Sequence, residues 1–401
     1  MRPIGGVVIG YTGDKFGRKH ALVLSLTLMA VPTFALGCLP SYEQVGVLST
    51  ILLVCCRLLQ GMSVGGQLPA SLVYTVETKP KERWGLYGAL VMMAANIGTL
   101  IGNLVGASLR SALTEDQLIQ WGWRIPFLSG ILIAFVAIYL KKYGEEHHPN
   151  AGEYGTENRG EEEVQNPTQP QNPLRESIRK ENLPALISAT LTPMLWGAGF
   201  YVTFVWMAIF MEDLIQPSVP HAFWVNAAAL FFGVTLPLPL SGLLSDYFGR
   251  VVVMVIGALG LGACGPVMVL VISKGQAAPA FFSQLTLGLF LCLYGGPMSA
   301  FLLEQFPPKV RLTSVSLGYD LAHSSASAFS PLVATVLSQN VSLMAPGFIY
   351  SFFAVLGLLG MFLATNIHKG ERVNDGQAKT TEVDATRKQR EESDPQINPI
   401  V

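Results

Sequence analysis

The stretch between Pro184 and Asn366 carries only nine charged side chains, and this scarcity constrains the fold more than any other feature of the chain. Most of the nine lie between apolar runs long enough to cross a hydrocarbon core of about 30 Å, which takes roughly 20 helical residues. The runs do not alternate as membrane-spanning strands do. The whole chain has 13% charged residues, against about 25% in soluble domains. We therefore predict an all-α polytopic membrane protein.

Ten apolar runs are predicted to span the membrane. They are residues 20–39, 46–76, 86–109, 122–140, 184–211, 222–244, 251–273, 280–303, 312–338 and 345–366. Residues 1–13 precede them and are apolar except for Arg2, but they would form only about 20 Å of helix. We interpret this first segment as the end of a helix whose beginning is missing from the chain.

The positions of Lys and Arg predict the orientation of the spans. If residues 14–19 lie in the cytoplasm, the loops on that side hold 21 of the 26 basic residues. The positive-inside rule then places both the central loop and the C-terminus in the cytoplasm. We predict a multi-pass protein of the plasma membrane.

Two segments are too polar to fold alone. Residues 143–183 are rich in Glu, Asn, Gln and Pro, and residues 367–401 have the same character. Neither buries enough apolar surface to offset the loss of chain entropy, so we predict a disordered cytoplasmic linker and a disordered cytoplasmic tail. The remaining residues form an N-terminal bundle, 1–142, and a C-terminal bundle, 184–366.

Two motifs occur once in each half, in the same order. The first is a glycine, an aspartate and an arginine at four-residue spacing: Gly10, Asp14 and Arg18, then Gly242, Asp246 and Arg250. The second is a glutamate, a proline and an arginine: Glu77, Pro80 and Arg83, then Glu304, Pro307 and Arg311. Both motifs repeat at nearly the same offset, which indicates two homologous bundles.

These repeated residues predict a gate at the cytoplasmic side. A glycine lets a neighbouring helix approach closely, and an aspartate at a tight turn can meet a helix N-terminus or an arginine. The predicted networks are Asp14, Arg18, Glu77 and Arg83 in one half, and Asp246, Arg250, Glu304 and Arg311 in the other. The alternative is that these are ordinary loop charges that only obey the positive-inside rule.

Four longer motifs carry a resemblance to a known family. They are Arg2-Pro3-Ile4-Gly5-Gly6, Arg57-x-x-Gln60-Gly61-x-Ser63-x-Gly65-Gly66, Trp121-Gly122-Trp123-Arg124-Ile125-Pro126-Phe127, and the run from Glu304 to Ser316-Leu317-Gly318-Tyr319. In them the chain resembles the metabolite:H⁺ symporters of the major facilitator superfamily, which include the proline/betaine transporter and the α-ketoglutarate, shikimate and citrate permeases.

The resemblance implies a secondary active transporter that moves a small organic anion or zwitterionic osmolyte, together with protons, by alternating access. It implies a major facilitator fold of two pseudo-symmetric bundles with twelve helices, so this chain would lack helix 1 and part of helix 2. Two positions depart from the family. Gln67 stands where the family typically has a glutamate, and Asp320 stands where it usually has an asparagine.

Charged residues within spans are candidates for the transport site, because inserting each one costs about 2.5–3.5 kcal/mol and such residues face the bundle interior. The guanidinium groups of Arg2 and Arg57 could each bind a substrate carboxylate with two parallel hydrogen bonds. The alternative is that each arginine caps helix carbonyls or pairs with a neighbouring aspartate. Asp320 and His323 share a helix face and form a candidate proton relay, or else a structural hydrogen bond.

Three uncharged residues complete the predicted substrate site. They are Gln60, Tyr201 and Tyr319. A buried amide such as Gln60 lines a polar path or bridges two helices. An aromatic ring such as that of Tyr201 holds a quaternary ammonium by cation–π attraction, or simply packs.

The remaining composition gives no sign of other functions. The five cysteines lie in apolar runs and form no cluster, so we predict no metal site, disulfide framework or cofactor. A net charge of −1 implies no nucleic-acid partner, and nothing implies an oligomer. The partners are then a small-molecule substrate, protons and the lipid bilayer. The alternatives are a sugar porter-like carrier and a non-transporting truncated membrane protein; a membrane enzyme lacks a catalytic arrangement.

Overall fold

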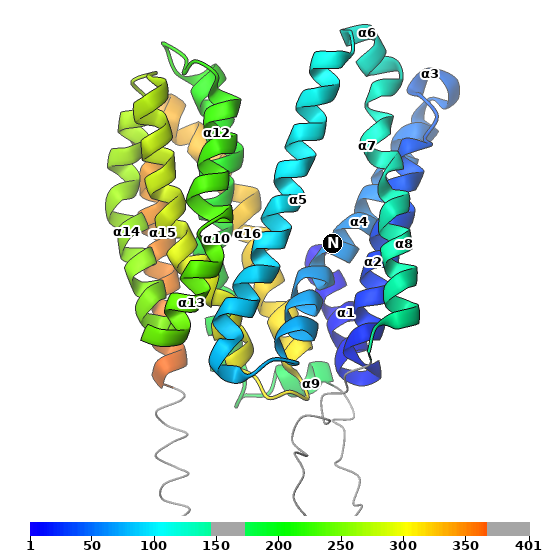
Figure 1. The fold of residues 1–401 in the computed structure, drawn as a ribbon, viewed down its shortest axis with the longest axis vertical. Coiled ribbons are helices and arrows are strands. Elements are labelled where there is room, and N and C mark those ends of the chain that lie inside the picture. The colour runs from blue at the N-terminus through cyan, green and yellow to red at the C-terminus, as the bar shows by residue number, and fades with distance from the viewer. Residues whose placement is uncertain (146–172, 367–401) are drawn as a thin grey trace, which may run out of the picture.

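The computed structural model describes residues 1–145 and 173–366, which form helices in two bundles and no strand (Figure 1). The elements of the N-terminal bundle are α1 (Arg2–Phe16), α2 (Arg18–Gly37), α3 (Tyr42–Val45), α4 (Val47–Val76), η1 (Lys81–Arg83), α5 (Trp84–Ala112), α6 (Glu115–Gln117), η2 (Leu118–Gly122), α7 (Arg124–Leu128) and α8 (Gly130–Tyr143).

The C-terminal bundle begins at Leu183. Its elements are α10 (Leu183–Phe200), η3 (Tyr201–Trp206), α11 (Met207–Ile209), η4 (Phe210–Leu214), α12 (Ala222–Leu230), η5 (Phe231–Thr235), α13 (Leu238–Phe248), α14 (Arg250–Ile272), α15 (Ala277–Glu304), α16 (Arg311–Asn340) and a last helix over Ala345–Asn366. The segments η3, η4 and η5 are π-helical turns that interrupt the two helices running from Leu183 to Leu214 and from Ala222 to Phe248.

Nine helices within the described residues are long and apolar enough to cross a membrane. They match nine of the ten predicted spans. The tenth prediction, residues 312–338, corresponds to α16, which has 30 residues but is too polar to belong with the nine. Helix α1 has 15 residues and ends at the turn that leads into α2. Gly17 and Gly249, with φ of 109° and 92°, make the equivalent turns in the two halves; such angles favour glycine.

Part of the predicted linker is folded. Residues Pro173–Ser177 form the short helix α9, which packs against α1 and α16. The side chain of Ser177 is fully buried, and its Oγ lies 2.8 Å from Oγ of Ser314. The prediction of disorder is therefore wrong for α9, because its proline and serine find a buried position beneath the bundles. Residues 146–172 and the tail 367–401 lie outside the described residues.

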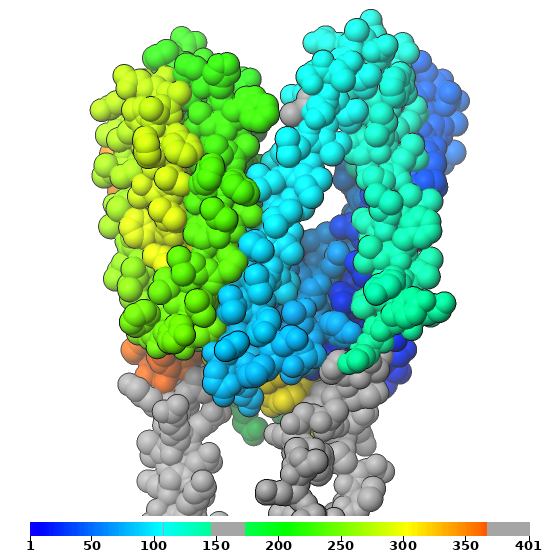
Figure 2. Space-filling model, viewed as in Figure 1, coloured from blue at the N-terminus to red at the C-terminus, as the bar shows by residue number. Residues whose placement is uncertain are grey.

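The bundles are in contact toward one end and stand apart at the other. Helix α1 packs on α16 and α5 packs on α13, near the loops that carry the repeated motifs. We call this the gate end. At the opposite end, where α6 lies, the two bundles stand apart (Figures 1 and 2). The molecule is thus closed at the gate end and open at the other.

Both contacts at the gate end depend on a motif glycine. A Cβ atom on Gly10 would lie 2.8 Å from Cα of Thr313, and one on Gly242 would lie 2.4 Å from the carbonyl oxygen of Gly85. Since these neighbours are backbone atoms, they cannot move aside as a flexible side chain would. The two halves therefore use the same device, as the repeat predicts.

Replacing Gly242 by leucine should destabilise the closed contact between α5 and α13. Overpacking costs about 1–3 kcal/mol, and the thermal midpoint in detergent should fall accordingly. Gly98→Leu on α5 is the matched control, since a Cβ atom at Gly98 meets nothing within 4 Å. Equal thermal midpoints for the two variants would mean that the close approach at Gly242 adds no stability.

Candidate functional site

Two aspartates bind helix N-termini across the boundary between the bundles. The carboxylate of Asp14 accepts hydrogen bonds from the backbone N–H groups of Leu312 and Thr313, at 3.2 and 2.7 Å. These groups belong to the first turn of α16. A carboxylate there meets unpaired N–H groups and the positive end of the helix dipole.

The second aspartate repeats this arrangement in the opposite direction. Asp246 of the C-terminal bundle accepts from the N–H groups of Gly85 and Leu86, both at 2.9 Å, in the first turn of α5. Each bundle thus caps one helix of the other. Separating the bundles at the gate end would leave both helix N-termini without their carboxylates.

The motif arginines also occupy equivalent positions. Arg18 is fully buried; it donates to Asp14, to Glu77 at 3.1 Å and to the carbonyl oxygen of Pro308 at 2.7 Å. The last of these bonds crosses to the other bundle. Charge-assisted bonds of this kind are stronger than those between neutral groups.

Its repeat counterpart follows the same pattern. Arg250 donates to Asp246, to Glu304 at 3.2 Å and, across the boundary, to the carbonyl oxygen of Lys81 at 3.3 Å. The gate end therefore holds two symmetric clusters of charge. Each cluster joins the bundles through an aspartate and an arginine.

The arginines of the second motif, Arg83 and Arg311, do not occupy equivalent positions in the two halves, and neither makes the contacts predicted for it in the part of the chain that the structure describes. Arg311 pairs with Glu77 of the other bundle at 2.7 Å and stacks over the ring of Trp84 at 5.3 Å, rather than joining Asp246 and Arg250. Arg83 is exposed, and its side chain makes no hydrogen bond or ion pair within the described residues. The extra residue before Arg311 places it in the first turn of α16, whereas Arg83 ends the turn η1.

Five predicted site residues gather where α1, α16 and η3 approach one another. The guanidinium Nε of Arg2 lies 3.5 Å from Oδ1 of Asp320, an ion pair that joins the two bundles. The ring of His323 stacks on Tyr319, with centroids 5.4 Å apart, and meets the edge of Tyr201 at 5.8 Å. These residues come from both halves of the chain.

The shape of α1 permits the ion pair. A Cβ atom on Gly6 would lie 2.3 Å from Oδ2 of Asp320, so only a glycine at this position leaves room for the carboxylate. Asp320 is nine residues from the start of α16, or about 14 Å along the helix axis. This is close to half the thickness of a hydrocarbon core. The pair therefore lies near mid-depth, where the N-terminus of the chain also lies (Figure 1).

Several polar atoms of Arg2, Asp320 and His323 are left without a hydrogen bond. Both carboxylate oxygens of Asp320, Nε of Arg2 and Nδ1 of His323 are buried, and none makes a hydrogen bond within the described residues. The side chain of Asp320 is 0% exposed. Buried polar groups normally have partners, so these atoms are suited to bind a ligand or a proton.

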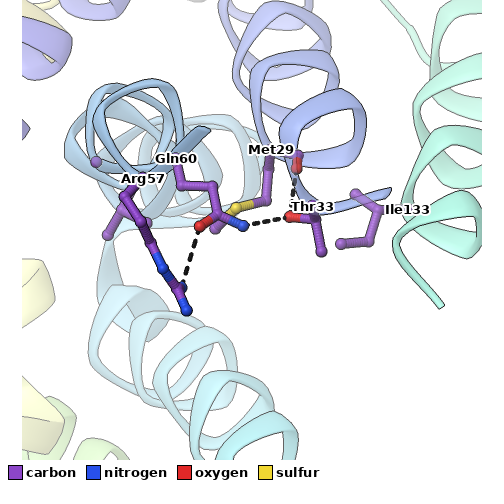
Figure 3. A pocket seen from close by; sticks show the side chains of 7 residues that line it. Met29, Thr33, Arg57, Gln60 and Ile133 are labelled. Atoms are coloured by element: carbon purple, nitrogen blue, oxygen red, sulfur yellow. Dashed lines mark hydrogen bonds between the residues drawn. The ribbon is translucent and has the colours of Figure 1, made fainter. Parts of the chain in front are cut away.

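Arg57 and Gln60 belong to a different place. They line a cavity of about 480 Å³ within the N-terminal bundle, between α2, α4 and α8 (Figure 3). Arg57 donates to Gln60 at 3.2 Å, and Gln60 donates to Thr33 at 2.8 Å. Arg2 packs on α4 at Gly65, two turns from Arg57 and about 12 Å along the helix. The structure thus places Arg57 and Gln60 apart from Arg2.

Sequence reasoning missed a row of hydroxyl groups on α16. Ser316, Ser327 and Ser330 are buried and share one helix face with Asp320 and His323, because all five are spaced by three or four residues. The signal was present in the sequence as hydroxyl side chains at helical spacing. The same residues make α16 too polar to count among the apolar spans.

Comparisons with known proteins agree with the motifs and the fold. The profile of the Major Facilitator Superfamily matches residues 3–238. A citrate-proton symporter of Klebsiella pneumoniae is 31% identical over 371 residues, which cover 90% of this chain and 78% of that protein. A proline/betaine transporter of Salmonella typhimurium is 27% identical over 364 residues, which cover 90% and 71%.

A solved structure shows the same fold. That of the proton:xylose symporter XylE matches with a TM-score of 0.67 and 19% sequence identity, and the match covers 90% of this chain and 83% of that chain. Two helical bundles that meet at one end around a buried polar site define the class of membrane carriers that work by alternating access. This chain belongs to the Major Facilitator Superfamily and is a secondary active transporter. The family predicted from the motifs is confirmed.

Proposed function

We propose that this transporter carries a small organic anion or zwitterion together with a proton, and that Arg2 binds the carboxylate of the substrate. The observation that carries the proposal is the ion pair of Arg2 with Asp320, which joins the two bundles near mid-depth and leaves hydrogen-bonding atoms unused. A guanidinium matches a carboxylate with two parallel hydrogen bonds. The names of the citrate-proton and proline/betaine relatives support substrates of this kind.

The geometry supports a specific order of coupling. While Asp320 is charged, its carboxylate competes with the substrate carboxylate for Arg2. A proton on Asp320 weakens that competition and leaves Arg2 free to bind the substrate. His323 then serves as the neighbouring group that passes the proton, and Tyr201 and Tyr319 form the aromatic wall of the site.

The clusters at the gate end supply the second part of the proposal. Asp14, Arg18, Glu77 and Arg311, with Asp246, Arg250 and Glu304, hold the bundles together while the opposite end is open. Opening the gate end breaks these bonds. Because most basic residues lie in the loops at this end, we assign the gate end to the cytoplasmic side of the plasma membrane.

Replacing Arg2 tests the substrate role. Uptake of labelled proline, glycine betaine, 2-oxoglutarate and citrate into proteoliposomes with an acid exterior should show saturable transport of at least one. Arg2→Gln should lower kcat/KM for that substrate by about 30-fold or more, since losing one partner of a buried charged hydrogen bond costs roughly 2–5 kcal/mol.

Arg57→Gln is the matched comparison for this experiment. Its guanidinium is exposed beside a separate cavity, so we expect a change in kcat/KM of less than about threefold, in line with an exposed polar contact. If Arg2→Gln transports like the wild type while Arg57→Gln fails, the substrate binds in the cavity of Figure 3 instead.

A further inference from the structure

One face of α16 carries a continuous row of polar side chains from the gate end toward the open end. Its members are Thr313, Ser316, Asp320, His323, Ser327 and Ser330. They are spaced by three or four residues, so neighbours in the row are about 5–6 Å apart. From first to last the row spans 17 residues, or about 26 Å of helix, which is nearly the thickness of a hydrocarbon core.

Every member of the row is buried, and Asp320 forms an ion pair with Arg2. Exposure is 0% for Thr313, Ser316 and Asp320, 2% for Ser330, and 8% for His323 and Ser327. Within the described residues, the hydroxyl groups of the four Ser and Thr residues, both oxygens of Asp320 and Nδ1 of His323 make no hydrogen bond. Other hydroxyls on α16 do bond to carbonyl groups, as Ser325 does to Leu321. Ser324, which lies between Asp320 and Ser327, has an unpartnered hydroxyl as well.

The helices that cover the row approach it closely at two glycines. Gly6 of α1 faces Oδ2 of Asp320, and Gly197 of α10 faces the row one to two turns further on. A Cβ atom on Gly197 would lie 3.0 Å from Oγ of Ser327 and 3.2 Å from Nδ1 of His323. Two glycines thus stand where a side chain would reach the polar atoms.

Ordered water satisfies buried hydroxyls where the site has space for it and offers two to four polar partners. Polar groups about 5–6 Å apart can be joined by one water molecule between each pair, because each hydrogen bond spans about 2.8 Å. A row linked in this way passes protons from group to group. It would connect the open end to Asp320 while the gate end is closed, and Asp320 to the gate end once that end opens.

We propose that this face of α16 is the proton path of the transporter: Ser330 and Ser327 lead protons from the open end to His323 and Asp320, and Ser316 and Thr313 lead them on to the gate end. The inference rests on the proposed proton coupling and names the groups that would carry it. The path ends beside Asp14, which accepts from the N–H of Thr313 at 2.7 Å.

The charged and titratable groups around the path are few. Arg2 faces Asp320 from α1, and Tyr201 faces His323 from η3. Tyr319 stacks on His323 from α16 itself, and Asp14 and Arg18 adjoin the gate end of the row. A proton moving along the row changes no covalent bond other than O–H and N–H bonds, and it is driven by the imposed pH gradient.

Alanine substitution of the hydroxyls separates proton delivery from substrate binding. In proteoliposomes, Ser316→Ala/Ser327→Ala/Ser330→Ala should slow substrate-coupled proton uptake, followed with a pH-sensitive dye, by about tenfold or more. Exchange of labelled for unlabelled substrate at equal pH needs no net proton movement, and its rate should stay within about twofold of the wild type. Gly197→Ala, which would place a Cβ atom 3.0 Å from Oγ of Ser327, should likewise slow proton uptake and leave the rate of exchange close to that of the wild type.

Ser325→Ala is the control on the opposite face of the same helix, since its hydroxyl bonds to the carbonyl of Leu321; both rates should match the wild type. Unchanged proton uptake in the triple variant would overturn the path. So would an equal fall in proton uptake and exchange, because the hydroxyls would then serve folding or substrate binding. If wild-type protein transports substrate without moving protons, the proposed coupling itself fails, and this outcome is distinct from the other two.

Discussion

Asp320→Asn should abolish accumulation of substrate against its gradient while exchange at equal pH continues. If the wild type moves one proton with each substrate molecule, a gradient of one pH unit supplies about 1.4 kcal/mol per substrate. This free energy supports about a tenfold ratio of substrate concentration across the membrane. An amide of the same size keeps the volume beside Gly6 but carries no exchangeable charge. The concentration ratio in the variant should therefore fall to about one.

The measurement is the steady-state ratio of labelled substrate inside and outside proteoliposomes, with and without a pH gradient. Asp213→Asn is the matched control, because Asp213 is an exposed carboxylate in η4, away from the ion pair. If Asp320→Asn still concentrates substrate tenfold, the carboxylate of Asp320 does not couple substrate transport to proton movement. Loss of exchange as well as accumulation would instead show that Asp320 is needed to bind the substrate.

Glu77→Gln should open the gate end far more than the same change at its repeat partner, Glu304. Glu77 pairs with two buried guanidiniums, Arg18 at 3.1 Å and Arg311 at 2.7 Å, and its side chain is 14% exposed. Removing one partner of a buried ion pair costs about 3–5 kcal/mol. Glu304 pairs with Arg250 at 3.2 Å and is 38% exposed, and pairs at such positions contribute about 0–1 kcal/mol.

A buried cysteine at the gate end would report this difference. Leu312 is 0% exposed, where α16 meets α1, so Leu312→Cys should react with a thiol reagent only when the gate end opens. A loss of about 3 kcal/mol corresponds to a rise of more than 100-fold in the open population. We expect that rise with Glu77→Gln, little change with Glu304→Gln, and none with Arg83→Gln. Equal rates for the two glutamate variants would show that the bond between Glu77 and Arg311 does not hold the bundles together.

The spans, the two bundles and the pairing of Asp14 with Arg18 could be predicted because each depends on residues close in sequence or on the internal repeat. Gly10 and Asp14 lie one turn apart on the same face of α1, and Arg18 follows Asp14 by four residues, after the turn at Gly17. The same spacing in the second half gives Asp246 and Arg250. Local geometry of this kind can be predicted without knowledge of the tertiary structure.

Contacts that cross between the bundles could not be predicted in the same way. The repeat places Arg311 in its own half, because nothing in the spacing indicates that its side chain reaches Glu77. Arg57 and Arg2 were grouped as arginines within spans, but two helical turns on α4 separate their positions. The helix α9 lies in a segment whose polar composition gives no sign of a helix. Ser177 bonds to the hydroxyl of Ser314 on α16, which only the folded structure brings near.

The central claim is that the two bundles alternate between access to one side and access to the other. Pulsed electron paramagnetic resonance can measure this on the full chain with two pairs of spin labels across the bundles. One pair stands at the gate end, at Lys79 and Lys309, and the other at the open end, at Glu115 and Lys274; all four side chains are exposed. With transported substrate and acid pH, the gate-end distance should lengthen in the same fraction of molecules in which the open-end distance shortens. Distances that stay fixed, or that lengthen together at both ends, would contradict the account.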